Sequence, residues 1–160
     1  MPNLAHSSEA RFQADYPFGT VIESHQHGVH QLIYASRGVL RVSSETETWI
    51  VPPGRAIWMP AHREHAITCR SDVALRFLYF KDDGDPAGAM AAVWSISPLM
   101  REVIIRLVEQ PEYTAEEALL TTLEAEIESV STLPLELPQP RSHRLLEITS
   151  TVLQHPHDKR

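Results

Sequence analysis

The sequence predicts a mainly β fold in which a small β-barrel is followed by an α-helical hairpin. Between residues 18 and 80, short segments rich in Val, Ile, Thr and aromatic residues are interrupted by turn residues every 8 to 12 positions, as in an all-β barrel or sandwich. Further along the chain the apolar period changes from two to about 3.6, which indicates helices. The 160 residues suffice for one hydrophobic core with an appendage, but not for two domains of ordinary size.

Seven strands are expected in the β region. They are residues 19–24, 30–36, 39–43, 47–51, 56–59, 66–70 and 74–80. Arg37-Gly38 and Pro52-Pro53-Gly54 supply sharp turns between them. A polar segment with Asp, Gly and Pro, residues 81–86, ends the β region, so we expect residues 1–88 to comprise an N-terminal arm and the barrel.

Two amphipathic helices are expected within residues 89–133. Ser97 and Pro98 form an N-cap and first-turn pair for the first helix, which extends to Pro111 with the apolar stripe Leu99, Val103, Leu107 and Val108. Thr114 and Glu117 have capping-box spacing at the start of the second helix, whose apolar stripe is Leu119, Leu120, Leu123, Ile127 and Val130. Both stripes are wide enough to cover the barrel and still leave apolar surface, so we expect this hairpin to mediate a homodimer.

The C-terminal residues have a different composition. Residues 134–142 include three prolines, cannot sustain a helix and are expected to form a stiff, extended linker. Residues 143–160 then contain one more amphipathic segment, with Leu145, Ile148 and Val152, which stops at His155-Pro156. We expect this segment to be the first helix of a second domain that continues beyond the chain.

Composition narrows the class of protein. No apolar run approaches the roughly 20 residues that a membrane span needs, no secretion signal is recognisable, and the single Cys69 cannot form an internal disulfide, so we expect a cytoplasmic protein without a membrane partner. Residues 1–135 hold 18 Asp and Glu against 10 Lys and Arg. That part of the chain would repel a phosphate backbone, so no DNA-binding residue is expected in it.

Histidines cluster in the β region. His25 and His27 are separated by one residue and can face the same side of a strand, and Gln31 keeps their parity. His30 has the opposite parity, which favours a solvated or sheet-packing role. A second group, His62, His65 and Cys69, follows Gly54 and Pro60.

These spacings resemble the two motifs of the cupin superfamily. The first motif is Gly, five residues, His-x-His, three or four residues, Glu, six residues, Gly, and the chain matches it at Gly19, His25, His27 and Gly38, with Gln31 in place of Glu. The second is Gly, five residues, Pro-x-Gly, two residues, His, three residues, Asn. The chain keeps Gly54, Pro60 and His65 and departs from it at His62 and Cys69.

The resemblance implies a double-stranded β-helix, or jelly-roll, barrel that holds a divalent metal through His25, His27, Gln31 and His65. Imidazole ligands favour Zn or Ni and leave Fe and Cu open, whereas an amide in place of a carboxylate lowers the affinity expected for Mn. Four further residues are candidates for binding an effector: Ile33, Trp58, His62 and Cys69. Ile33 and Trp58 are expected either in the wall of the pocket or in the core. His62 would either gate the pocket or face solvent. Cys69 is expected to point inward, where its thiol could line the pocket or be buried and inert.

Beyond the barrel, the chain resembles the AraC-type transcription regulators. The resemblance rests on residues 31–42, on residues 49–61, on the helical hairpin and on the proline-rich linker followed by residues 140–160. It implies a sensor domain in which a metal or small-molecule effector controls operator binding by a C-terminal helix-turn-helix domain beyond Arg160.

The alternative is a small metal-dependent cupin enzyme of the dioxygenase or isomerase type. An enzyme needs a general acid or base near the metal. Glu23 has the parity of His25 but is expected to lie a step outside the site, and the other pocket candidates are neutral, so we expect no enzymatic activity. A reading frame that continues past Arg160 into a basic helical domain would favour the regulator, and a stop codon there would favour the enzyme.

Overall fold

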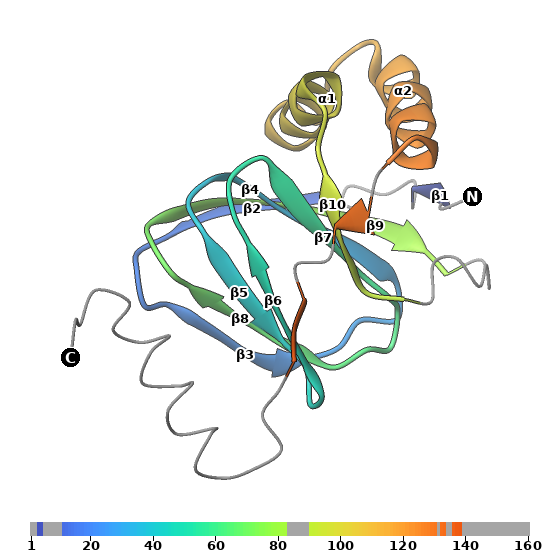
Figure 1. The fold of residues 1–160 in the computed structure, drawn as a ribbon. Coiled ribbons are helices and arrows are strands. Elements are labelled where there is room, and N and C mark those ends of the chain that lie inside the picture. Colours follow the sequence, from blue (N-terminus) through green and yellow to red (C-terminus); the bar gives the residue numbers. More distant parts are fainter. Residues whose placement is uncertain (1–2, 5–10, 83–89, 131, 134–135, 139–160) are drawn as a thin grey trace, which may run out of the picture.

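Two antiparallel sheets face each other, and two helices cover the outer side of the larger one (Figure 1). The computed structural model describes residues 3–4, 11–82, 90–130, 132–133 and 136–138. Its elements in chain order are β1 Asn3–Leu4, β2 Arg11–Tyr16, β3 Val21–His25, β4 His30–Arg37, β5 Leu40–Ser43, β6 Glu47–Val51, β7 Arg55–Met59, β8 His65–Cys69, β9 Val73–Lys81, β10 Ala92–Ser95, α1 Pro98–Glu109, α2 Glu116–Glu128, β11 Thr132–Leu133 and β12 Glu136–Pro138. The mainly β fold with a following helical hairpin, predicted from the sequence, is confirmed.

The larger sheet has the strand order β1-β9-β4-β7-β10-β11, with β2 also paired to β9, and the smaller sheet has the order β12-β6-β5-β8-β3. Strands of the larger sheet alternate strictly, since Ile33 and Ile57 point toward the smaller sheet while Leu32 and Trp58 point toward the helices. The fold therefore has two apolar layers, one inside the barrel and one between sheet and helices.

The turn between β4 and β5 requires glycine at position 38. Gly38 has φ +91°, and a Cβ there would lie 2.3 Å from the carbonyl oxygen of Asp72. Any other residue would be strained and would push the neighbouring loop away. The same loop carries Ser71, whose hydroxyl accepts a hydrogen bond from the backbone of Val39 at 2.9 Å.

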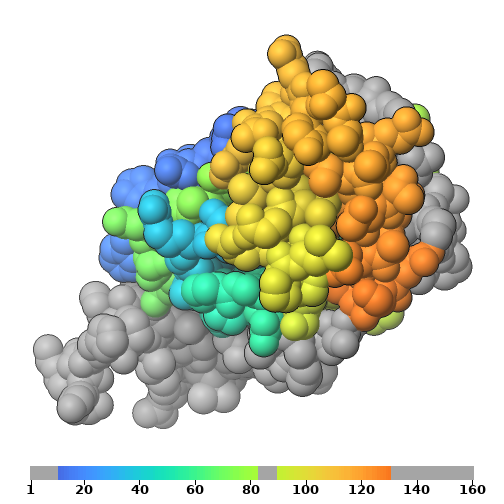
Figure 2. All heavy atoms as spheres, turned by 90° about the horizontal axis from the view of Figure 1, so that it is seen from above, coloured from blue at the N-terminus to red at the C-terminus, as the bar shows by residue number. Residues whose placement is uncertain are grey.

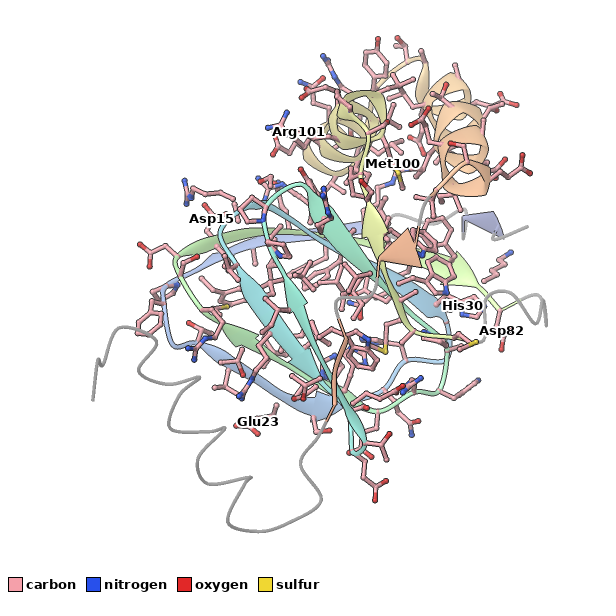
Figure 3. All side chains as sticks on the ribbon, in the orientation of Figure 1. Asp15, Glu23, His30, Asp82, Met100 and Arg101 are labelled. Atoms are coloured by element: carbon pink, nitrogen blue, oxygen red, sulfur yellow. The ribbon has the colours of Figure 1, made fainter. Side chains whose placement is uncertain are left out.

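The first helix begins as predicted. The Ser97 hydroxyl accepts a hydrogen bond from the Met100 N–H at 3.0 Å, and Pro98 occupies the first turn. Met100 points from α1 toward the sheet, where it is buried (Figure 3). The neighbouring Arg101 interacts with the side chain of Tyr34 in β4. Seen from the helical side, α1 and α2 lie next to each other over the barrel (Figure 2).

The predicted capping box of the second helix is wrong. Helix α2 begins at Glu116 with Ala115 as N-cap and no side-chain cap bond. The Glu116 N–H donates to the carbonyl of Tyr113 at 3.1 Å, which holds Thr114 in a turn before the helix. Glu116 and Glu117 instead place negative charge in the first turn, where the helix dipole favours it.

Five of the described strands lie where the sequence predicted none. Strands β1 and β2 fall in the expected N-terminal arm, and both pair with β9. Strands β10 and β11 flank the helical hairpin, and β12 lies in the expected linker, paired with β6. The expected helix in residues 143–160 and most of the expected loop at residues 81–86 lie outside the described residues.

Candidate metal and effector site

Three histidines meet at one end of the barrel. His25, the last residue of β3, is directly opposite His65, the first residue of β8, and His27 follows two residues beyond β3. Their rings lie 4.6 Å apart for His25 and His65, 4.8 Å for His25 and His27, and 5.8 Å for His27 and His65, measured between centroids. One nitrogen from each ring lies within 4.8 Å of the others, which fits ligands of a single ion.

A β-bulge in β3 brings His25 into this cluster. Ile22 pairs with Ile67 and His25 with His65, so β3 uses one residue more than β8 between the two pairs. Ile22 and His25 consequently both line the barrel interior, although they are three residues apart. Glu23, which the simple alternation would have aligned with His25, is exposed on the outside of the smaller sheet (Figure 3).

Backbone carbonyls orient two of the rings. His25 Nδ1 lies 2.7 Å from the carbonyl oxygen of Glu23, and His65 Nδ1 lies 2.9 Å from that of Arg63. Because a carbonyl only accepts hydrogen bonds, each Nδ1 carries the proton and each Nε2 keeps a lone pair. Hydrogen bonds from the second ring nitrogen to a backbone carbonyl are typical of metal-binding histidines. The Nε2 of His27 is also buried, and no described residue forms a hydrogen bond with it.

Gln31 completes the cluster. Its Oε1 lies 3.1 Å from His65 Nε2, and its amide nitrogen donates to the Tyr79 hydroxyl at 3.3 Å. In this orientation two electron-pair donors face each other, which is unfavourable by itself but suits a shared cation. Without a cation, rotation of the amide by 180° would let Gln31 donate to His65 instead. The donor set therefore fits a divalent metal with three nitrogen ligands and one amide oxygen.

Burial lowers the pKa of two of the histidines, His27 and His65. The pKa of His65 falls from 6.5 to about 4, mainly because the ring is removed from water and also because of the neighbouring His25 and His27, while the hydrogen bond to Arg63 opposes the shift. The pKa of His27 is lowered by burial and by His25. Neutral imidazole is the form that binds metal, so His27 and His65 need not lose a proton to do so near pH 7.

A cavity of about 240 Å³ adjoins the histidines. Its lining comprises Phe12, Tyr16, Ile22, His25, His27, Gln31, Ile67, Phe77 and Tyr79, and no residue of this set is acidic. Phe12 and Phe77 stack with centroids 5.8 Å apart and form an aromatic wall. The site thus joins a polar end that could hold metal to an apolar space that could hold an organic ligand.

Trp58 does not line this cavity: of the two positions expected for it, pocket wall and core, it occupies the core. It lies on the helix-facing side of the larger sheet and stacks on Trp94 at 5.0 Å. His30 packs over the same Trp58 ring at 5.1 Å, which agrees with the sheet-packing role expected for it. Trp58 follows Ile57 in β7, and one step along a strand is enough to change the side of the sheet.

The other three candidates for effector binding also lie away from the cavity lining. Ile33 and Cys69 are fully buried in the interior core, and burial raises the pKa of the Cys69 thiol, which disfavours the reactive thiolate. His62 is exposed, adopts φ 62° and borders a separate surface hollow, while its N–H donates to the carbonyl of His27 at 2.7 Å. Its backbone, rather than its ring, supports the histidine cluster.

The true lining residues were missed for two reasons. Phe12 and Tyr16 belong to β2, whose alternation Phe12, Ala14, Tyr16 was present in the sequence but was assigned to an arm. Tyr79 lies opposite Gln31 in the pairing of β4 with β9, a register that a single strand does not reveal. Pairing between strands therefore places three of the nine lining residues.

The β part of the chain is similar to a known protein family. The family model described as a cupin domain matches residues 12–81. The HTH-type transcriptional regulator NimR of Escherichia coli (strain K12) is 34% identical over 86 residues, which are 54% of this chain and 32% of that regulator. The chain thus matches about a third of the length of this relative.

Solved structures give a broader likeness. ToxT from Vibrio cholerae aligns over 94% of this chain and 66% of its own, with a TM-score of 0.53 and 7% identity. Unsaturated fatty acid bound wild-type ToxT from strain SCE256 aligns with the same TM-score and identity, over 94% and 64%. At this identity the likeness shows a shared fold.

Proposed function

We propose that this chain, whose residues 12–81 form a cupin domain, is the effector-sensing part of an AraC-type transcription regulator. The observation that carries the proposal is the 34% identity to an HTH-type transcriptional regulator. The cavity beside the histidines supplies a place for the effector, and the fold resemblance to ToxT, which has been solved with a fatty acid bound, is consistent with a ligand-binding role. Among the described residues, none of the helices has the length and apolarity to cross a membrane.

A divalent transition metal would be held by His25, His27 and His65, with Gln31 as the weaker fourth ligand. Neutral nitrogen ligands favour Zn or Ni over harder ions. The ion would supply an electrophilic position for an effector at the polar end of the cavity. The residues themselves orient that position, since Glu23 and Arg63 fix two rings through their backbone carbonyls.

Strand β2 connects the cavity to the helical hairpin. Its inner side chains, Phe12 and Tyr16, line the cavity. On the opposite side, Arg11 donates to the Leu107 carbonyl at the end of α1 at 3.0 Å and forms an ion pair with Glu116 at the start of α2. An effector that moves the inner face of β2 would therefore change contacts at the junction of the two helices.

A second link runs parallel to the first. Asp15, whose side chain points outward from β2 (Figure 3), lies 3.7 Å from Arg76, and Arg76 donates to Glu109 at the end of α1 at 2.6 and 2.9 Å. The proposed control is a population shift, in which effector binding favours one arrangement of β2, hairpin and linker over another.

The DNA contact in this proposal comes from a C-terminal helix-turn-helix domain, of which residues 143–160 would be the first helix. Homodimerisation through the hairpin and a cytoplasmic location are parts of the same proposal. The hairpin buries most of its apolar stripe against the sheet, and its largest exposed apolar side chains are Leu99 and Tyr113, exposed by 53% and 39%. A dimer interface would have to use these positions.

A metal-dependent cupin enzyme is the second candidate, because three converging histidines also suit catalysis. Within the part of the chain that the structure describes, the residues that line the cavity include no carboxylate that could act as general acid or base.

The test uses the whole reading frame that encodes these residues. We expect it to continue past Arg160 into a basic helical domain, and the purified product to bind DNA from its own upstream region in fluorescence anisotropy. Adding and removing metal or effector should change that affinity. A stop codon at this point, or turnover of a substrate without DNA binding, would support the enzyme instead.

A further inference from the structure

The charge of the cavity limits what it can bind once a metal is present. All nine lining side chains are uncharged when their histidines are neutral. Two acidic residues that precede the histidines in the chain face elsewhere: Glu23 is exposed, and Glu64 accepts a hydrogen bond from the Ser24 hydroxyl at 3.0 Å on the surface. A divalent ion held by the lining residues would keep its full double charge.

Gln31 is the residue responsible for this imbalance. In the cupin motif a Glu occupies the position and contributes one negative charge to the site, whereas the amide of Gln31 contributes none. A buried charge is stable only when it is paired. A negatively charged group of the ligand would supply the missing charge.

The remainder of the cavity is apolar and small. Phe12, Ile22, Ile67 and Phe77 supply aromatic and aliphatic walls, and the tyrosine rings of Tyr16 and Tyr79 add further aromatic surface. The volume of about 240 Å³ lies below the roughly 300–1,000 Å³ of pockets that hold drug-sized ligands. It suits a single ring rather than a long chain or a sugar, which would need many polar partners.

We propose that the effector is a small monocyclic aromatic carboxylate, with its carboxylate at the histidine end and its ring against Phe12 and Phe77. The inference rests on the proposed metal-loaded sensor and specifies its ligand class. Gln31 is then the specificity-determining residue: its neutral amide allows an anion to approach, and the aromatic wall selects a flat apolar body.

The test compares benzoate with benzamide, which has nearly the same shape and no charge, on the 160-residue chain loaded with Zn(II). We expect benzoate to bind at least about tenfold more tightly than benzamide in isothermal titration calorimetry, because only benzoate neutralises the ion. Acetate, which lacks the ring, should bind more weakly than benzoate. In protein loaded with Co(II), benzoate should shift the visible absorption of the ion.

Three variants test which side chains determine the binding of benzoate. Gln31→Glu should weaken benzoate binding by at least about tenfold while metal uptake is retained, because a second carboxylate repels the anion. Glu64→Gln removes a surface carboxylate that lies outside the cavity and should leave benzoate binding unchanged. Phe12→Ala should weaken benzoate binding and leave acetate binding as it was.

Equal binding of benzoate and benzamide, or no binding of either to metal-loaded protein, would overturn the proposed ligand class. Neither result would affect the sensor proposal, which the DNA-binding experiment tests separately. Protein that takes up neither Zn(II) nor Co(II) overturns both the metal assignment and this inference, and leaves the cavity as a site for a metal-independent ligand.

Discussion

The two sides of β4 contain adjacent residues of opposite kinds. His30 faces the helices, where its Nδ1 accepts a hydrogen bond from the Ala61 N–H at 3.0 Å, its ring packs on Trp58 and its Nε2 lies 3.5 Å from Asp82 (Figure 3). Gln31 faces the barrel interior, where its amide oxygen and the Nε2 of His65 point at each other. Both His30 and His65 are buried, with 4% and 1% of their surface exposed.

The comparison shows that burial alone does not identify a ligand. His30 packs on an aromatic ring and accepts a hydrogen bond from a backbone N–H, so its role is structural. A histidine whose proton is held by a carbonyl, and whose other nitrogen meets further lone pairs, is prepared for a cation. The residues on the helix-facing side of the sheet therefore stabilise the fold, whereas the interior residues at the histidine end are suited to bind a cation.

Trp58→Ala should separate the two roles most strongly. Removing a buried Trp that stacks on Trp94 is expected to lower the free energy of unfolding by about 3–5 kcal/mol, measured by urea denaturation. Metal affinity of the folded fraction should stay the same, because the side chain lies on the opposite face from the histidines. A large loss of metal affinity in folded protein would contradict the assignment of Trp58 to the outer layer.

Lowering the pH should destabilise the metal-free protein because of His65, which is buried inside the barrel. Between about pH 6.5 and 4, unfolded His65 binds a proton whereas native His65 does not, so stability falls as the pH falls through this window. The shift corresponds to roughly 3 kcal/mol. Urea midpoints at pH 7.5 and 4.5 measure the loss, and His65→Gln should flatten this part of the profile; an unchanged profile in that variant would assign the acid sensitivity to other groups.

The double variant His25→Ala, His27→Ala should lose metal. Two of three nitrogen ligands disappear, so we expect affinity for Zn(II) to fall by more than about a hundredfold in competition with a chromophoric chelator. Elemental mass spectrometry of protein purified without a His-tag should find about one metal per chain before the change and little after it. His30→Asn is the matched control, in which metal should be retained although packing on Trp58 is lost.

Arg11→Ala should have the smallest effect on stability. Its guanidinium is largely buried and bonds the carbonyl of Leu107 and the carboxylate of Glu116, so we expect a loss of about 1–2 kcal/mol. The exposed pair of Arg101 and Glu102 supplies the control, since Glu102→Ala should change stability by less than about 0.5 kcal/mol. Equal losses of stability in the two variants would contradict the proposal that β2 connects the cavity to the helices.

Part of the site was accessible from sequence because spacing is local. His25, His27, Gln31 and His65 fall at motif positions, and the structure places all four at one end of the barrel. For Trp58 the sequence left pocket wall and core open, because its position next to Pro60 does not specify which side of the sheet it faces. Phe12 was missed because β2 is stable only when β9 pairs with it, and a lone six-residue segment gives little signal.

The sequence by itself determined the class of fold, the order of barrel and hairpin, the N-cap at Ser97 and the four residues of the histidine cluster, because each depends on patterns within a few residues of chain. Tertiary structure decided which residues form the cavity and how it is joined to the helices. The bulge that turns Glu23 outward, the pairing of Gln31 with Tyr79 and the reach of Arg11 to Leu107 all join segments far apart in the chain. Such contacts depend on register and packing between strands, which local sequence patterns do not specify.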